Sequence, residues 1–331
     1  MDGMRILVLG GTAWLGHAVA RAALDAGHAV TCVARGSAVP KGASVVNADR
    51  DQDDALAPVS TRRWDAVVDV ATEPGHVRRA VRDLSGTAGR FVFVSSANAY
   101  ASLAGDGTAE DAPLHEPLTD EAMSSPADYG PAKVAGEQAV LAGFGAARTA
   151  IVRPGLIGGP GDPTGRSSYW PLRLARPSNP AGRVLAPDAA DQPVSMIDVR
   201  DLAAWVVRLA EGRTAGVFNT VGDPVSFGEH LAAARAAAAH SGVIAWARAD
   251  WLLAHGVSQW MGPRSLPLWV SEESVMGVNT ISNDRARCAG MTLRPLPETL
   301  ADTLAWAQNR VDTVTGAGLT DDEERELLAL M

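Results

Sequence analysis

Short apolar runs alternate with amphipathic stretches along the first half of the chain. Runs of this kind, rich in valine, are typical of strands buried on both faces, and the stretches between them have a helical period. This alternation predicts a parallel sheet that helices cover on both sides. The expected strands are Arg5–Leu9, Ala29–Val33, Ser44–Asn47, Ala66–Val70, Arg90–Val94 and Thr149–Arg153. The expected helices between them include Trp14–Ala26, Gly75–Leu84 and Ser125–Leu141.

The pattern changes after Pro154. Residues Gly155–Pro193 are rich in Gly, Pro, Arg and Ser and show little periodicity, which predicts a long irregular connection. Most tryptophans lie in the remaining part of the chain and indicate a second, smaller core or a lid. Helical patterns return there at Val199–Leu209, Gly228–His240, Leu296–Gln308 and Asp321–Leu330.

Composition narrows the functional classes. Of the 331 residues, 47% are hydrophobic and 20% are charged, as in ordinary globular proteins. The formal charge of -9 argues against a nucleic-acid partner and against docking on an anionic membrane, because both need a basic surface. No apolar run reaches the roughly 18 residues of a membrane span, and no signal-peptide pattern is present, so we expect a cytoplasmic protein. Cys32 and Cys288 cannot form a disulfide framework or a structural zinc site, and we expect no metal.

A glycine turn follows the first expected strand. Glycine permits a tight turn and lets a pyrophosphate approach the backbone, while the start of the next helix supplies free N–H groups and a positive dipole. An ordinary strand-to-helix turn is the alternative, because a single glycine motif is weak evidence. Its place at the first strand of an alternating pattern favours a dinucleotide cofactor. The expected cofactor contacts in this turn are Gly10, Thr12, Trp14, Leu15 and Gly16.

The end of the second strand bears on which cofactor binds. An acidic residue there accepts the ribose 2′-hydroxyl of NAD, whereas an arginine accommodates the 2′-phosphate of NADP. The sequence has Arg35 and no acid at this point, which favours NADP (NADPH) through forked, charge-assisted hydrogen bonds. A solvated loop arginine is the alternative. Asp49 is expected to accept a hydrogen bond from the adenine amino group, unless residues 49–54 form only a surface turn.

Three side chains carry the expected chemistry. Tyr129 and Lys133 are four residues apart and therefore share one face of a helix. A free phenol has a pKa of about 10, too high for efficient proton transfer near neutrality, and a neighbouring ammonium lowers it. Ser96 follows an apolar strand, where a parallel sheet presents its ligands, and can share a substrate carbonyl oxygen with Tyr129. The same Tyr-x-x-x-Lys spacing also arises by chance on solvated helices, and Ser95 is expected to cap or satisfy backbone groups.

With these motifs in this order, the chain resembles the short-chain dehydrogenase/reductases, specifically their extended, epimerase/dehydratase-like branch. The resemblance covers roughly the first two hundred residues and is far more specific for fold than for substrate. It implies a Rossmann-type doubly wound parallel sheet with a smaller, mostly helical C-terminal substrate-binding region. It also implies that Ser96 polarises the substrate, that Tyr129 transfers the proton, and that Lys133 orients the nicotinamide ribose. The segments that carry it are 9–16, 95–100, 129–133, 153–155 and 197–202.

We accordingly expect an NADP-binding Rossmann domain with the catalytic residues over 1–155 and a substrate-binding region over 156–331. Residues near 194–222 are expected to return to the first domain. By resemblance, a homodimer through the helix of the Tyr-x-x-x-Lys motif is plausible.

The sequence departs from the family pattern at three points. Ala13 replaces the middle glycine of the turn. The His-x-Ala-Ala pattern that follows the fourth strand reads Asp-Val-Ala-Thr at residues 69–72, so only Ala71 carries over as a cofactor contact. An Ala-Asn pair follows Ser96, where the sugar 4,6-dehydratases have Asp-Glu. Without those acid–base groups, elimination of water from a nucleotide sugar by that route is disfavoured.

The leading hypothesis is an NADPH-dependent oxidoreductase that reduces a carbonyl group of a small metabolite by hydride transfer. Tyr129 would donate the proton and Ser96 would stabilise the forming alkoxide. Tyr169, Trp170 and Arg166 are candidate substrate contacts and suggest an aromatic or hydrophobic substrate, although core packing explains the aromatic residues equally well.

Two other functions stay open. One is a nucleotide-sugar epimerase with tightly bound NAD(P), in which Arg166, Arg173 or Arg183 contacts a diphosphate, unless these arginines are ordinary surface charge of an irregular segment. The other is a non-catalytic relative that senses the cofactor or binds nucleic acid. The intact Ser96, Tyr129 and Lys133 and the acidic composition count against it.

Overall fold

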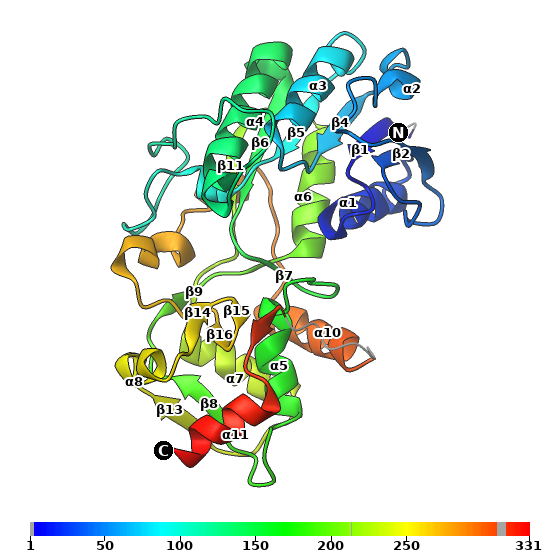
Figure 1. The fold of residues 1–331 in the computed structure, drawn as a ribbon. Coiled ribbons are helices and arrows are strands. Elements are labelled where there is room, and N and C mark those ends of the chain that lie inside the picture. Colours follow the sequence, from blue (N-terminus) through cyan, green and yellow to red (C-terminus); the bar gives the residue numbers. More distant parts are fainter. Residues whose placement is uncertain (1–2, 213, 310–315) are drawn as a thin grey trace.

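The computed structural model describes residues 3–212, 214–309 and 316–331, which fold into an upper and a lower lobe in Figure 1. Within these residues, a parallel sheet of seven strands forms the centre of the first lobe, in the order β11-β6-β5-β4-β1-β2-β3. The strands are β1 (Arg5–Leu9), β2 (Ala29–Ala34), β3 (Ser44–Asn47), β4 (Ala66–Asp69), β5 (Phe91–Val94), β6 (Thr149–Pro154) and β11 (Gly216–Thr220).

All the expected strands are present, with bounds that differ by one residue at most. Strands β1, β2, β4, β5 and β6 were predictable because they are buried on both faces, so that successive apolar residues all find a core, whereas the edge strand β3 is largely exposed. In β1, Ile6 and Val8 contact one core, whereas Leu7 and Leu9 contact the other. Strand β11 was not among the expected strands, because it is an edge strand in which Val217 and Phe218 are the only large apolar residues. It pairs in parallel with β6.

Helices cover both faces of this sheet, which confirms the predicted doubly wound α/β fold (Figure 1). Residues of α1 and α6 belong to the core on one face, and residues of α3 and α4 to the core on the other. The helices of this lobe are α1 (Trp14–Asp25), α2 (Ala57–Ser60), α3 (Pro74–Leu84), α4 (Tyr129–Phe144), α6 (Val199–Glu211) and α9 (Asp284–Cys288). Short 3-10 helices lie at η1 (Ala97–Ala99), η2 (Pro126–Asp128) and η3 (Ala146–Arg148).

The second lobe has a core of its own, in which Trp170, Phe227 and Trp269 are almost completely buried. Its helices are α5 (Arg166–Ala175), α7 (Phe227–Ala237), α8 (Ala249–Ala254), α10 (Leu296–Gln308) and α11 (Asp321–Ala329), with the 3-10 helix η4 (Glu273–Asn279) beside them. Its strands are short and pair two by two: β7 (Ile157–Gly158) with β10 (Ile197–Asp198), β8 (Val184–Pro187) with β13 (Ile244–Ala247), β9 (Pro193–Val194) with β12 (Val225–Ser226), β14 (Ser258–Trp260) with β16 (Ser265–Pro267), and β15 (Gly262–Pro263) with β17 (Ala317–Gly318).

The expected irregular connection over Gly155–Pro193 is wrong in part, because the segment contains α5, β7 and β8. Helix α5 is buried around most of its circumference and has Pro171 inside it. Proline is disfavoured inside a helix, and Pro171 together with the many Gly and Pro residues of the flanking segment explains why the sequence pattern did not predict α5. Among the described helices, none has the length and hydropathy required to cross a bilayer.

Candidate active site

The glycine turn lies at the carboxyl end of β1. Gly10 has a φ of 95°, and a Cβ there would be 2.7 Å from Cγ2 of Val70. The turn therefore requires glycine for both its conformation and its packing. Helix α1 follows with Ala13 as its N-cap, and no side chain caps it and no acidic residue lies in its first turn. Its first N–H groups are thus left for an anionic group.

The other residues expected to contact the cofactor lie in the same turn or at the start of α1. Thr12 and Leu15 are half-buried and Gly16 is buried. Trp14 has an additional role that the sequence did not indicate: its Nε1 donates a hydrogen bond of 3.0 Å to the carbonyl oxygen of Pro160. The indole therefore ties the start of α1 to the chain that enters the second lobe.

Arg35 and Asp49 lie at the ends of the neighbouring strands. Arg35 is exposed directly after β2, and no ion pair joins it to a described residue. His76 and, more weakly, Arg35 and Arg79 hold the pKa of the Asp51 carboxyl below its usual range. Asp49 is exposed, and its carboxylate accepts the backbone N–H of Asp51 at 3.2 Å. This position of Asp49 agrees with the surface turn considered as its alternative.

Helix α4 brings the three catalytic candidates together at the carboxyl end of β5. A Cβ on Gly130 would be 2.2 Å from the carbonyl oxygen of Asn98, so only glycine lets the start of α4 approach η1 this closely. Tyr129 is the first residue of α4 and is half-buried. Ser96 is 8% exposed, and its Oγ accepts the N–H of Asn98 at 3.1 Å, which caps η1.

Lys133 lies one turn further along α4 and is only 3% exposed. Its Nζ donates to the carbonyl oxygens of Ala71 at 2.7 Å and Val94 at 2.9 Å, and it lies 5.8 Å from the centroid of the Tyr129 ring. An ammonium has three N–H donors, so one of them remains for a ligand. The structure thus brings Lys133 between the ends of β4 and β5, beside Tyr129 and the segment that begins with Ser96.

A buried ionic network lies behind these residues, which sequence reasoning missed. Glu137 is one turn after Lys133 on α4, and the Arg153 guanidinium forks onto its carboxylate with distances of 2.9 and 2.6 Å. The expectation for Ser95 was wrong, because its hydroxyl donates to Glu137 at 2.5 Å and not to a backbone group. An acid at i+4 from Lys133 on an otherwise apolar helix was the available signal. Tyr100 extends the network to Asn219, and burial raises the pKa of this phenol.

Of the candidate substrate contacts, only Arg166 lies near the catalytic candidates. It begins α5, and its guanidinium carbon is 5.5 Å from the centroid of the Trp260 ring. Burial lowers the pKa of Arg166, whereas the charges of Asp162 and then Tyr129 act in the opposite direction. The guanidinium is therefore within electrostatic reach of Tyr129. Trp260 itself has a φ of 69°, a left-handed conformation that a non-glycine residue adopts only under strain.

Tyr169 and Trp170 lie in the core of the second lobe instead. Trp170 is completely buried and its Nε1 donates to the carbonyl oxygen of Pro267 at 2.9 Å. Tyr169 is 7% exposed, and burial raises its pKa. These positions favour core packing, the alternative considered above. Arg173, a candidate diphosphate contact of the epimerase hypothesis, is also buried and pairs with Asp321 at 2.5 Å.

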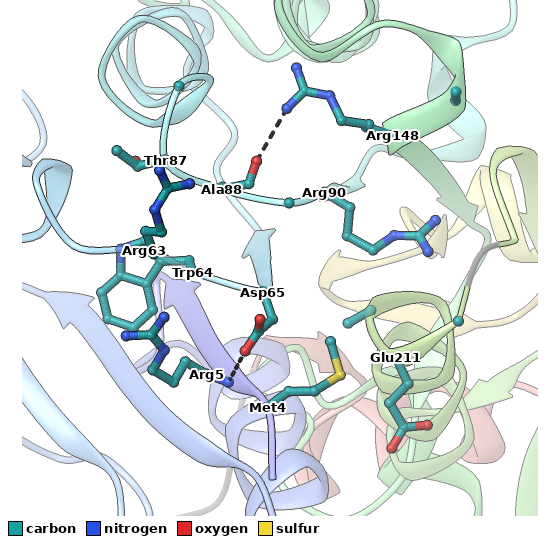
Figure 2. A pocket seen from close by; sticks show the side chains of 15 residues that line it. Met4, Arg5, Arg63, Trp64, Asp65, Thr87, Ala88, Arg90, Arg148 and Glu211 are labelled. Atoms are coloured by element: carbon teal, nitrogen blue, oxygen red, sulfur yellow. Dashed lines mark hydrogen bonds between the residues drawn. The ribbon is translucent and has the colours of Figure 1, made fainter. Parts of the chain in front are cut away.

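A cavity of about 850 Å³ lies at the opposite, amino-terminal edge of the sheet (Figure 2). Arg63, Arg90 and Arg148 line it, but their guanidinium groups point in different directions. Arg148 donates to the carbonyl oxygen of Ala88, and Arg90 donates to that of Thr214. None of the expected site residues lines this cavity. The arrangement of catalytic candidates thus places the site at the carboxyl edge, as expected for a parallel α/β sheet.

Comparison with known proteins agrees with this arrangement. The sequence model of the NAD dependent epimerase/dehydratase family matches residues 6–89 and 79–220. A 2'-dehydrokanamycin reductase of Streptomyces kanamyceticus is 30% identical over 225 residues, which make up 65% of this chain and 61% of that protein. The match therefore spans less than two thirds of the reductase.

Solved structures show the same fold at lower identity. The Bordetella bronchiseptica enzyme WbmG in complex with NAD and UDP has a TM-score of 0.66 at 18% identity, and the match covers 96% of this chain and 99% of that chain. MoeE5 in complex with UDP-glucose and NAD has a TM-score of 0.62 at 20% identity, with 93% of this chain and 100% of that chain covered.

Proposed function

The chain belongs to the NAD dependent epimerase/dehydratase family, and from this premise we propose that it is an NADPH-dependent reductase of a carbonyl group in a small metabolite. The observation that carries the proposal is the convergence of Lys133, Tyr129 and the Ser96 segment at the carboxyl end of β5. The uncharged Ala-Asn pair after Ser96 supports reduction over dehydration.

The residues present fit a dinucleotide. Gly10 adopts a positive φ and leaves no room for a side chain, and the uncapped start of α1 offers N–H groups to a pyrophosphate. The third N–H of Lys133 would hold a ribose hydroxyl. When bound, the nicotinamide supplies the hydride, and the protein supplies orientation and the proton.

Proton transfer falls to Tyr129 in this proposal. Its phenol hydroxyl makes no hydrogen bond to a described residue and would donate its proton to the carbonyl oxygen of the substrate. Ser96 would donate a second hydrogen bond to the same oxygen. Because its Oγ already accepts the N–H of Asn98, the hydroxyl hydrogen is free to point at the substrate. Two such donors stabilise the negative charge that develops on this oxygen.

The preference for NADPH over NADH rests on Arg35. This side chain is exposed, has no acidic partner among the described residues and follows β2, where the ribose 2′-phosphate would lie. We therefore expect Arg35→Asp to weaken NADPH binding far more than NADH binding. Equal losses of affinity for NADPH and NADH would show that Arg35 does not select between the two cofactors.

Substrate binding is assigned to the second lobe, with Arg166 and Trp260 as the residues nearest the chemistry. A guanidinium beside an indole ring can bind a polar group of a flat substrate while the ring packs on its face. The named activity of the Streptomyces relative supports reduction. The ligands named with the solved structures favour the second candidate, a nucleotide-sugar epimerase with retained cofactor.

One assay separates the two candidates. The purified protein is given NADPH or NADH with a panel of ketones, quinones and nucleotide sugars, and oxidation of the cofactor is followed by absorbance. A reductase consumes NADPH in a one-to-one ratio with a carbonyl substrate. An epimerase interconverts a nucleotide sugar without net consumption, and this outcome would replace the proposal with the second candidate.

A further inference from the structure

Arg50 and Asp69 form a buried ion pair at the carboxyl end of β4. The guanidinium forks onto the carboxylate, with Nη1 2.7 Å from Oδ1 and Nη2 2.8 Å from Oδ2. Asp69 is completely buried and Arg50 is 8% exposed. Burying such a pair costs free energy, and breaking it is strongly destabilising. Its place next to the catalytic candidates therefore points to a role beyond stability.

The Arg50 end of the pair is held from several sides. Its Nη2 also donates to the carbonyl oxygen of His76 at 2.7 Å. Its own carbonyl oxygen accepts two hydrogen bonds from the guanidinium of Arg79, at 3.1 and 2.9 Å. Arg50 therefore fixes Asp69 in relation to α3 and to the segment after β3.

Asp69 is connected to Lys133 by hydrogen bonds through Ala71. Oδ1 of Asp69 accepts the N–H of Ala71 at 2.9 Å. The carbonyl oxygen of the same residue, Ala71, accepts the hydrogen bond of 2.7 Å from Nζ of Lys133. Arg50, Asp69, Ala71 and Lys133 thus form one continuous chain of hydrogen bonds. Asp69 occupies the position of the histidine in the family's His-x-Ala-Ala pattern after the fourth strand. This chain of hydrogen bonds therefore includes a residue at which the sequence departs from the family pattern.

We infer that Arg50 and Asp69 are positioning residues that hold the Ala71 carbonyl, and through it the ammonium of Lys133, at the place where the cofactor ribose binds. The inference rests on the proposed function for its catalytic consequence, but its effect on cofactor binding does not require turnover. Two carbonyl oxygens, of Ala71 and Val94, orient Nζ. Loss of the ion pair releases the first of them, so that the free N–H of Lys133 no longer has a fixed direction.

The test is a cycle of variants measured by cofactor affinity. The dissociation constant of NADPH is determined by nicotinamide fluorescence for the full-length protein, Arg50→Leu, Lys133→Met and the double variant. We expect Arg50→Leu to weaken binding about tenfold, because a small misplacement of a binding group is costly. In the Lys133→Met background, the same substitution should change affinity less than about twofold, because Arg50 acts through Lys133.

Two further variants separate positioning from stability. Arg148→Leu removes a guanidinium that bonds only carbonyl oxygens at the opposite edge of the same sheet (Figure 2), and should lower stability without changing the affinity for NADPH. Arg50→Lys keeps the charge and should restore part of the affinity that Arg50→Leu loses. It also replaces Arg50→Leu in the cycle if that variant does not fold, as judged by thermal unfolding.

The affinity measurements test the positioning of Lys133 independently of whether the protein reduces a carbonyl compound. Equal losses of affinity from the Arg50 substitution with and without Lys133 would overturn the inference, as would unchanged affinity in a destabilised but folded variant. If no carbonyl compound is reduced by the unaltered protein, the proposed function fails, while the affinity cycle still tests the positioning of Lys133.

Discussion

The two lobes hold their functional residues in different ways. In the first lobe, Tyr129 and Lys133 lie on one regular helix and Ser96 lies two residues after the end of a central strand. In the second lobe, Trp260 lies in a short strand with a left-handed backbone, and Arg166 begins a helix after an irregular segment. Among the described residues, the non-glycine positions with positive φ are Ala239, Trp260, Arg264 and Leu268, and all belong to the second lobe.

This difference indicates a division of labour. In the proposed function, elements with regular packing fix the proton donor and the cofactor, where small displacements cost much of the rate. In the same proposal, segments under backbone strain shape the part that meets the substrate, where changes are better tolerated and where families diversify. Substitutions in the first lobe should therefore affect turnover of every substrate, and those in the second lobe should affect selectivity or local stability.

The largest expected effect is that of Tyr129→Phe. Removal of the phenol hydroxyl takes away the proton donor, and we expect kcat to fall by about 10³-fold or more for every carbonyl substrate, with NADPH affinity unchanged. Steady-state kinetics and cofactor fluorescence measure the two quantities. Tyr100→Phe is the matched control: it loses one hydrogen bond to Asn219 and about 1 kcal/mol of stability while kcat stays close to that of the parent. A similar loss of kcat in both variants would contradict the assignment.

The next effect tests the rigidity of the first lobe. Arg153→Leu leaves the Glu137 carboxylate buried without its forked partner, and we expect the free energy of unfolding to fall by about 3–5 kcal/mol. Urea unfolding measures the change. The exposed Arg35→Leu is the control and should lie within about 0.5 kcal/mol of the parent. A loss below about 1 kcal/mol for Arg153→Leu would show that this network does not hold the site in place.

The next prediction concerns the pH dependence of stability, which involves a histidine of the second lobe. His230 on α7 is fully buried, and burial lowers its pKa to about 4. The unfolded chain takes up this proton below about pH 6.5 while the folded chain does not, so stability is lost as the pH falls from 6.5 towards 4. Between pH 7 and pH 5, His230→Leu should lose about 2 kcal/mol less than the parent protein in urea unfolding. Parallel losses in the two proteins would show that His230 is not the group responsible.

The smallest effect concerns backbone strain itself. Ala239 follows the C-cap of α7 with a φ of 49°, and Ala239→Gly should stabilise the protein by about 0.5–1 kcal/mol because glycine adopts this conformation without strain. Ala232→Gly, at an exposed position inside the same helix, should instead destabilise it by about 1 kcal/mol. Thermal unfolding of the pair measures both. If both substitutions lower the unfolding temperature, the left-handed backbone at the end of α7 does not reduce the stability of the protein.

The same contrast explains how much could be predicted from the sequence. The strands of the first lobe other than β11 were predictable because each contains a local apolar run, and the meeting of Ser96, Tyr129 and Lys133 followed from parallel topology. Glu137 with Arg153, and Arg50 with Asp69, were not predictable, because each pair joins residues whose proximity arises only in the folded chain. Helix α5 has Pro171 inside it, which argues against a helix in the sequence, and the burial of Trp170 depends on contacts with distant segments of the second lobe.

The central claim is that Tyr129 and its neighbours in the first lobe serve net reduction of a carbonyl group. It is tested most directly with NADPH deuterated at the transferred position of the nicotinamide and a carbonyl substrate from the panel. Mass spectrometry of the product should show one deuterium on the former carbonyl carbon, with one NADPH consumed for each product formed. Conversion of a nucleotide sugar to its epimer without consumption of NADPH and without label in the product would contradict the account.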